Sequence, residues 1–149
     1  MAQSKGSPPP YFDLDKEYAL QQQIKNLIPN GLVESAHDCS DGGLYIALLE
    51  SAMPNELGFY IITDSEFRKD AYLFGEAQSR VVVSVKAENQ EAFVELISAS
   101  DVDYTLLGEV TENGSLTIDG EDFGLVKEKK AIYDNALAES VNAGALATY

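Results

Sequence analysis

The 149-residue chain has few of the residues that build disulfides, metal centres and surfaces for anionic polymers. It contains one cysteine, Cys39, and one histidine, His37. A disulfide within the chain is therefore impossible, and so is a tetrahedral zinc site made of cysteine and histidine. Lysine and arginine total 10 against 25 aspartate and glutamate residues, which gives a net charge of −15. Such a surface repels phosphate backbones and anionic lipids, and this argues against nucleic-acid and membrane partners.

Long apolar runs are missing as well. No stretch approaches the roughly 18 apolar residues of a membrane span, and the opening MAQSKGSPPP lacks the apolar segment of a signal peptide. With 45% hydrophobic and 23% charged residues, the composition is that of a globular protein. We therefore expect one acidic, cytoplasmic domain at residues 11–149. Residues 1–10, which end in three prolines, are predicted to be a linker or a remnant of cloning.

Hydrophobic periodicity predicts alternating helices and strands. Helices are expected where apolar residues recur every three to four positions, and strands where β-branched residues run together. The expected helices cover residues 13–28, 44–53, 65–74, 89–98 and 125–141. The expected strands cover residues 32–36, 58–63, 80–85, 104–111 and 115–118. This order predicts an α+β fold with a mixed, largely antiparallel sheet and helices packed on it.

Some details of this prediction concern individual elements. The run RVVVSV at residues 80–85 is continuous and β-branched, which is typical of a central strand. Asn113-Gly114 is a strong turn signal, so the last two expected strands should form a hairpin. Asp13 is expected to cap the first helix, and Ser65 is expected to cap the third. The first helix carries an apolar stripe composed of Leu20, Ile24, Leu27 and Ile28. The last helix carries an apolar stripe composed of Ile132, Tyr133, Ala136 and Leu137.

One segment, SAHDCSDGGL at residues 35–44, concentrates the residues that carry chemistry. A nucleophilic triad is not favoured there, because its serine, histidine and aspartate are too close in sequence to be arranged freely. A catalytic pair of Cys39 and His37 would need an accidental geometry. A calcium loop that starts at Asp38 fails, since its twelfth position is Leu49 instead of glutamate.

Two interpretations of the segment remain open. In the first, Gly42 and Gly43 let the backbone approach a phosphate, and the following helix points free N–H groups at it. Ser40 then adds a hydroxyl donor, and Asp38 or Asp41 can ligate an accompanying Mg²⁺. In the second, Ser40 or Asp41 is a plain helix cap and the glycines only allow tight packing. The residues alone favour the plain cap, and neither GxxxxGK[ST] nor GxGxxG is present.

Four segments resemble one family. SAHDCSDGGL followed by ALLESA resembles a helix-opening signature in the C-terminal domain of the aminoimidazole-ribonucleotide-synthetase superfamily. More narrowly, it resembles the phosphoribosylformylglycinamidine synthase family. Three other segments agree with that family in order and spacing: PPPYFDLDKEYALQ, LFGEAQSRVVVSV and YTLLGEVTENGSLTI. The resemblance covers about residues 8–140.

The resemblance implies a C-terminal domain of a cytoplasmic ligase of purine biosynthesis. Members use ATP and Mg²⁺ to activate the amide oxygen of formylglycinamide ribonucleotide, and ammonia from glutamine then gives the amidine. The partners it implies are an ATP-binding domain of the same parent chain, a glutaminase domain or subunit, and the ribonucleotide substrate. This chain alone is expected to be inactive and to retain no cofactor.

The resemblance also assigns residues. It places four of them in a loop that faces the phosphate-bearing ligand: Ser40, Asp41, Gly42 and Gly43. Asp38 matches an acidic position that can reach nucleotide-bound Mg²⁺, and no catalytic residue is expected. His37 is interpreted as a supporting residue. Glu76 and Arg80 either line an interdomain cleft or form a helix-end ion pair, and the pair is the favoured interpretation.

Two other functions remain as alternatives. The first is another member of the superfamily, such as aminoimidazole ribonucleotide synthetase, thiamine-phosphate kinase or selenophosphate synthetase. The residues of the SAHDCSDGG and EAQSR segments argue against it. The second is a non-catalytic assembly domain, which would expose an apolar face that a neighbouring domain normally covers.

Overall fold

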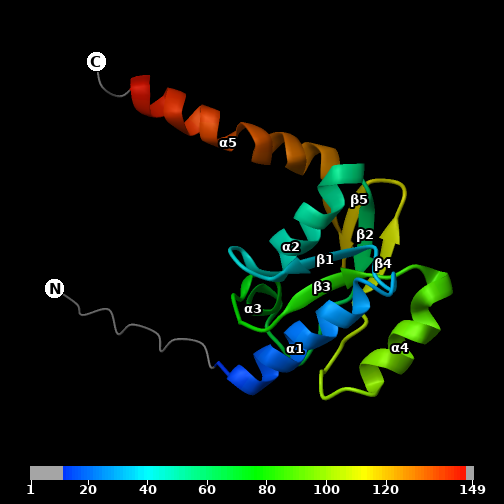
Figure 1. Cartoon of the computed structure of the whole chain (residues 1–149). Coiled ribbons are helices and arrows are strands. Elements are labelled where there is room, and N and C mark those ends of the chain that lie inside the picture. The colour runs from blue at the N-terminus through cyan, green and yellow to red at the C-terminus, as the bar shows by residue number, and fades with distance from the viewer. Residues whose placement is uncertain (1–11, 147–149) are drawn as a thin grey trace. The chain divides into compact units, whose positions relative to one another are not determined.

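A computed structural model describes residues 12–146 of the protein (Figure 1). The expected linker at residues 1–10 lies outside this range. The chain divides into two compact units. The first combines the chain up to Leu48 with Phe67–Thr105, and the second combines Leu49–Glu66 with the chain from Leu106 onward. The boundary between them falls inside one helix.

The elements alternate along the chain much as the sequence predicts. The helices are α1 (Leu14–Leu27), α2 (Gly43–Ala52), α3 (Lys69–Phe74), α4 (Gln90–Ser98) and α5 (Val126–Leu146). Short 3₁₀ turns cover Met53–Asn55 and Ala87–Asn89. The strands are β1 (Ser35–Asp38), β2 (Gly58–Ile61), β3 (Val81–Ser84), β4 (Gly108–Thr111), β5 (Ser115–Ile118) and β6 (Glu121–Leu125). The predicted α+β class with a mixed, largely antiparallel sheet is confirmed, although the strands form two sheets.

The first unit contains an antiparallel pair of strands, β1 and β3, whose register runs from Ser35 opposite Ser84 to Asp38 opposite Val81. The expectation that residues 80–85 form a central strand is wrong, because in the described part of the chain β3 pairs with β1 alone. All four β3 residues are half-buried. The β-branched run therefore reflects burial inside the unit, which a two-stranded sheet also provides.

The starts of two helices test the expected caps. The Asp13 carboxylate accepts hydrogen bonds from the backbone N–H groups of Asp15 and Lys16, so the predicted cap of α1 is confirmed. The cap predicted at Ser65 is wrong, since α3 begins at Lys69. The carboxylate of the preceding Asp64 accepts the backbone N–H of Glu66 at 2.9 Å. This local turn competes with helix formation, so α3 begins further along the chain than Ser65.

The second unit contains a four-stranded sheet in the order β4-β2-β5-β6. β2 and β5 are parallel, and the other neighbours are antiparallel. Side chains that alternate along the two central strands form the core, and Val126 at the start of α5 belongs to it. The buried hydrophobic residues of these strands are Phe59, Ile61, Leu116 and Ile118.

The hairpin expected at Asn113-Gly114 is wrong, because β2 lies between β4 and β5. The three residues between β4 and β5 instead cross the start of β2 at Gly58. A Cβ at Gly58 would lie 2.2 Å from the carbonyl oxygen of Ser115. The hairpin of this sheet joins β5 and β6 through Asp119-Gly120, whose φ values of 53° and 77° fit a type I′ turn.

α5 begins in the core and continues with an exposed surface. The backbone N–H of Val126 donates to the carbonyl oxygen of Gly114 at 2.9 Å. From residue 131 to residue 142 every side chain is exposed, and Leu137 in the expected stripe is 77% exposed. Figure 1 shows this helix running on from β6. None of the helices within residues 12–146 is both long and apolar enough to span a membrane.

Candidate functional site

The SAHDCSDGGL segment starts on a strand whose pairing fixes where the loop begins. β1 ends at Asp38, and the antiparallel ladder continues for one more bond, from the backbone N–H of Cys39 to the carbonyl oxygen of Arg80 at 2.9 Å. Arg80 directly precedes β3. The start of the loop before α2 is therefore hydrogen-bonded to the residue before β3, and β3 belongs to the LFGEAQSRVVVSV segment.

Residues 40–43, which we call the glycine corner, turn the chain from β1 into α2. The backbone N–H of Gly43 donates to the carbonyl oxygen of Ser40 at 2.9 Å. Gly42 and Gly43 have φ values of 81° and 66°, in the left-handed region that side chains disfavour. Gly43 is buried, while Ser40 and Asp41 are exposed. The structure thus brings the four expected ligand-facing residues together in one tight, partly exposed turn.

Gly43 also lies against the end of α3. A Cβ on Gly43 would lie 2.8 Å from the carbonyl carbon of Phe74 and 2.9 Å from the carbonyl oxygen of Gly75. Backbone atoms cannot move aside as a flexible side chain can, so this approach requires glycine. The ring of Tyr45, in the first turn of α2, packs on the ring of Phe74 with centroids 5.5 Å apart.

Glu76 and Arg80 contact this corner through different partners. The backbone N–H of Gly42 donates to Oε1 of Glu76 at 3.0 Å. The Arg80 guanidinium donates to the carbonyl oxygens of Gly75 and Tyr72 at 3.2 and 3.5 Å. The expected ion pair between these two side chains is therefore replaced, within the described chain, by separate bonds to backbone groups.

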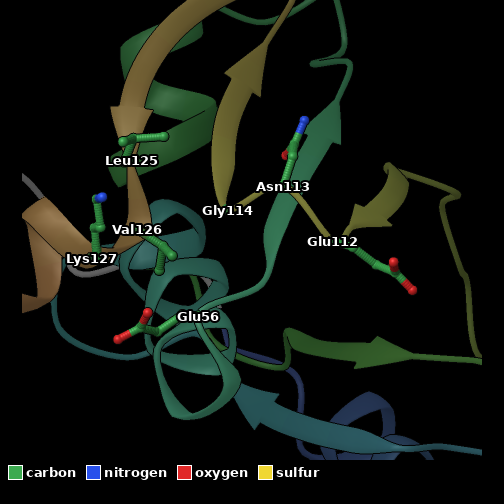
Figure 2. A pocket seen from close by; sticks show the side chains of 7 residues that line it. All are labelled: Glu56, Glu112, Asn113, Gly114, Leu125, Val126 and Lys127. Atoms are coloured by element: carbon green, nitrogen blue, oxygen red, sulfur yellow. The ribbon is translucent and has the colours of Figure 1, made fainter.

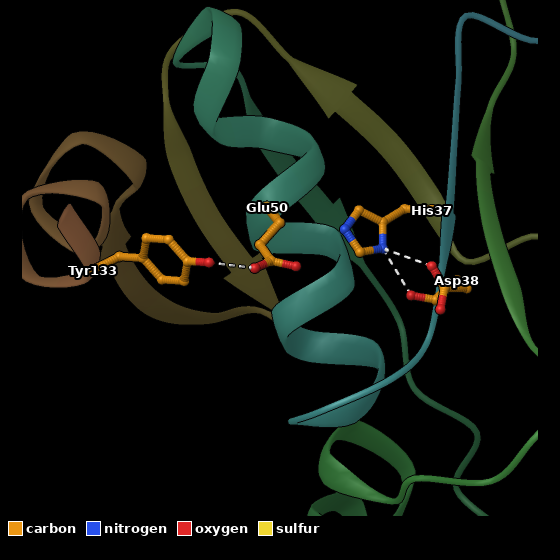
Figure 3. Close-up of polar contacts among 4 residues, drawn as sticks. All are labelled: His37, Asp38, Glu50 and Tyr133. Carbon is orange, nitrogen blue, oxygen red and sulfur yellow. Dashed lines mark hydrogen bonds and ion pairs between the residues drawn. The ribbon is translucent and has the colours of Figure 1, made fainter. Parts of the chain in front are cut away.

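His37 and Asp38 lie next to each other on β1 (Figure 3). Nδ1 of His37 is 2.7 Å from the carbonyl oxygen of Asp38 and 4.0 Å from its carboxylate. An imidazole with the proton on Nδ1 donates to that carbonyl. The Asp38 carboxylate is 78% exposed. Figure 3 also shows a separate contact of the second unit, in which the Tyr133 hydroxyl donates to Glu50 at 2.8 Å.

Cys39 lacks the properties of a nucleophile. Burial raises the pKa of its thiol, the Arg80 charge opposes this shift, and the Asp38 charge adds to it. The side chain is half-buried. A thiol whose pKa is raised stays protonated near neutral pH, and the thiolate is the reactive form.

No metal centre is preformed in the part of the chain that the structure describes. Groups of three or more histidine, cysteine, aspartate or glutamate side chains that could hold an ion do not occur among residues 12–146. The exposed Asp38 carboxylate fits a narrower role, as one ligand to a Mg²⁺ ion whose other ligands are phosphate and water oxygens. It does not fit a resident metal site.

A hollow of about 250 Å³ lies elsewhere, in the second unit (Figure 2). Seven residues line it: Glu56, Glu112, Asn113, Gly114, Leu125, Val126 and Lys127. It is open and lies beside the link between β4 and β5 (Figure 2). None of the expected site residues belongs to it. The hollow and the glycine corner are therefore separate features of the two units.

Sequence reasoning missed the role of Ser79. This residue has a φ of 60°, and its hydroxyl donates to a carboxylate oxygen of Glu17 at 2.6 Å. The bonds from Ser79 and then from Gln21 lower the pKa of Glu17. The contact ties the connection between α3 and β3 to α1. A serine inside a polar EAQSR segment gives no signal for a left-handed conformation or for a partner 62 positions away.

The fold and the glycine corner together point to a known class of domain. The chain belongs to the family described as AIR synthase related protein, C-terminal domain, which matches residues 5–121. A particular relative is the phosphoribosylformylglycinamidine synthase subunit PurL of Synechocystis sp., which is 41% identical over 121 residues. The alignment covers 79% of this chain and 16% of that protein. The resemblance found in the sequence is thereby confirmed, and the chain spans about a sixth of the length of this curated relative.

Solved structures share the fold. PurL of Thermotoga maritima complexed with FGAR superposes with a TM-score of 0.65 and 20% identity, over 84% of this chain and 23% of that one. The hydrogenase maturation protein HypE superposes with a TM-score of 0.58 and 15% identity, over 72% of this chain and 41% of that one. Proteins of different function therefore share this fold, which alone does not assign an activity.

Proposed function

We propose that the chain is the C-terminal domain of an ATP-dependent carbon–nitrogen ligase of purine biosynthesis. The reaction is the conversion of formylglycinamide ribonucleotide to formylglycinamidine ribonucleotide with ammonia derived from glutamine. The identity to the PurL subunit over most of the chain supports this activity. The observation that carries the proposal is the glycine corner, where the SAHDCSDGGL motif turns into the first turn of α2 with Ser40 and Asp41 exposed.

In this proposal the glycine corner faces the phosphate-bearing ligand. The first turn of a helix has N–H groups without intrahelical acceptors, and its dipole favours an anion. The Gly42 and Gly43 amides already donate to Glu76 and Ser40. The ligand is therefore expected to use the Ser40 hydroxyl and the next amides of α2. Asp38 would serve as one carboxylate ligand of nucleotide-bound Mg²⁺.

The principal chemistry belongs to groups outside this chain. We propose an ATP-binding domain of the same parent chain as the partner that brings ATP, and a glutaminase domain or subunit as the source of ammonia. Solved structures of PurLQS from T. maritima and of T. maritima PurL complexed with ATP and with ADP support these assignments for the family. Residues 11–149 are then the cytoplasmic synthase domain, and residues 1–10 a linker or remnant.

Two measurements test the proposal. The isolated chain mixed with formylglycinamide ribonucleotide, ammonia and Mg-ATP should release no phosphate, and turnover would refute its dependence on a partner domain.

Inorganic phosphate, titrated into the ¹⁵N-labelled chain, should shift the amide resonances of residues 40–45. The variant S40A should bind phosphate about threefold to tenfold more weakly, because one hydroxyl donor is lost. S98A on α4 is the matched control, and a spectrum without shifts at the corner would contradict the phosphate role.

The exposed stripe of α5 favours assembly as a second candidate function. Ile132 and Leu137 of the stripe are 67% and 77% exposed, and Val141, one turn further along α5, is 63% exposed. Apolar residues grouped on one helix are typical of a contact surface. Sedimentation velocity over a range of concentrations tests this candidate. A strictly monomeric chain at every concentration would contradict it, whereas self-association abolished by L137E would support it.

A further inference from the structure

The connection between α3 and β3, residues 75–80, contacts the glycine corner and the residue directly before it. At its start, Gly75 lies against Gly43. At its end, the carbonyl oxygen of Arg80 accepts the backbone N–H of Cys39 at 2.9 Å. Between them, Oε1 of Glu76 accepts the N–H of Gly42 at 3.0 Å. Three contacts from one short connection therefore reach three parts of the corner and its approach.

Arg80 acts on this connection through both its backbone and its side chain. Its guanidinium donates to the carbonyl oxygens of Tyr72 and Gly75. These carbonyls lie at the end of α3, where helical carbonyls have no intrahelical donor and the dipole favours a cation. The guanidinium also lies over the Tyr72 ring, 5.9 Å from its centroid. One residue therefore fixes the end of α3 and, through the Cys39 N–H, the start of the loop.

Glu76 supplies the side-chain acceptor for Gly42. The Gly42 N–H points to a charged oxygen, and hydrogen bonds to charged acceptors are stronger than those between neutral groups. Glu76 is exposed, so its substitution should leave the packing of the unit unchanged. The nearby Gln78 is exposed as well, and its side chain makes no hydrogen bond with any residue that the structure describes. The same connection thus contains a contact residue and a matched control.

We propose that Glu76 and Arg80 are positioning residues of the glycine corner. Arg80 holds the end of α3 against Gly43, and Glu76 holds the Gly42 amide, so that the corner keeps one conformation before any ligand arrives. This assigns a physical role to the four-residue spacing of the EAQSR segment. The consequence for ligand binding rests on the proposed function. The positioning of the corner by these two residues is a property of the chain alone.

Amide hydrogen exchange, measured by NMR on the whole chain without ligand, tests the role of Glu76. In E76A the Gly42 amide should exchange about threefold to tenfold faster, as expected for the loss of one partly exposed hydrogen bond to a charged group. E76Q keeps a carbonyl acceptor and should restore most of the protection. Q78A should behave as the original chain. Equal exchange in E76A and Q78A, or no recovery in E76Q, would overturn the proposal.

The role of Arg80 is tested in the same way. R80A should speed exchange of the Cys39, Gly42 and Gly43 amides together. R80K keeps the charge but has a single ammonium nitrogen instead of the guanidinium fork, so it should recover part of the protection. A uniform acceleration that includes the amides of α4 would overturn the positioning role, because it would show a general loss of stability. Phosphate titration of the same samples separates the two claims. If the amides of the corner do not shift with phosphate, the proposed function is contradicted. The exchange rates then still decide whether Glu76 and Arg80 position the corner.

Discussion

The glycine corner and the crossing at Gly58 are two crowded glycine sites that differ in what surrounds them. At the crossing, a Cβ would meet the carbonyl oxygen of Ser115 at 2.2 Å and Oγ1 of Thr111 at 2.5 Å. At the corner, a Cβ on Gly43 would meet backbone atoms of Leu73, Phe74 and Gly75, at the end of α3, at 2.8 to 3.0 Å. Both sites exclude a side chain on steric grounds. Crowding at a glycine is thus no evidence of a ligand site.

The difference lies in the polar groups beside each glycine. Gly58 is the first residue of β2, and alternate residues of β2 and its neighbour β5, such as Phe59 and Leu116, form the apolar core. Gly43 follows two exposed polar residues, and the adjacent amide of Gly42 is held by an exposed carboxylate. The crossing is therefore a packing device, whereas the corner combines tight packing with accessible donors and acceptors. Substitutions at the two sites should separate these properties.

The largest effect is expected for G58A. Three atoms would lie within 3.0 Å of the new Cβ, and two of them belong to the backbone of Ser115. Relief requires the link between β4 and β5 to move off β2, which should lower the free energy of unfolding by about 3–4 kcal/mol. Urea denaturation followed by circular dichroism measures this loss. A loss below about 1 kcal/mol would show that the crossing relaxes easily.

The second largest loss of unfolding free energy is expected for G43A, and G31A is its control. Both glycines have a φ of 66°, but nothing lies within 4 Å of a Cβ at Gly31. G31A should therefore cost about 1 kcal/mol, from left-handed backbone strain alone. G43A adds the clash with the end of α3 and should cost about 2–3 kcal/mol. Equal losses of unfolding free energy in the two variants would show that α3 does not press on the corner.

The sequence predicts the parts of the structure that depend on local residues. The cap at Asp13, the helical stripe that buries Leu27, and the strand-to-helix turn at Gly42-Gly43 follow from patterns a few residues long. The family resemblance follows in the same way, because its motifs are short and ordered. For these elements the local preference and the final fold agree.

Pairing between distant segments could not be predicted. Asn113-Gly114 makes a turn as expected, yet the strands on either side are separated by β2, which comes some 50 residues earlier in the chain. The actual hairpin uses Asp119-Gly120, an equally strong signal. At the corner, the bond between Glu76 and Gly42 joins residues 34 positions apart. Such choices depend on which segments the fold brings together, and a single sequence carries no local sign of them.

The smallest expected effect concerns acid and again separates the two regions. The hydrogen bond from Ser79 lowers the pKa of Glu17 in the folded chain, and Gln21 adds to the shift. A carboxylate whose folded-state pKa is lowered contributes stability that is complete above its unfolded pKa of about 4.3. That contribution disappears as the pH falls through the lower, folded value. Acid should therefore loosen the connection between α3 and β3, which Ser79 ties to α1.

The variant E17Q tests this by removing the titrating group. Its free energy of unfolding should fall less than that of the original chain between about pH 5 and pH 3. E91Q, which removes a carboxylate from the first turn of α4, is the matched control for losing a negative charge at a helix start. Since the contact is only part-buried and water screens it, the difference should be small. Exchange at residues 75–80 is therefore the more sensitive measurement. The amides around Gly58 should not respond to E17Q, because backbone bonds and packing hold that crossing, and an equal response in both regions would remove the distinction between them.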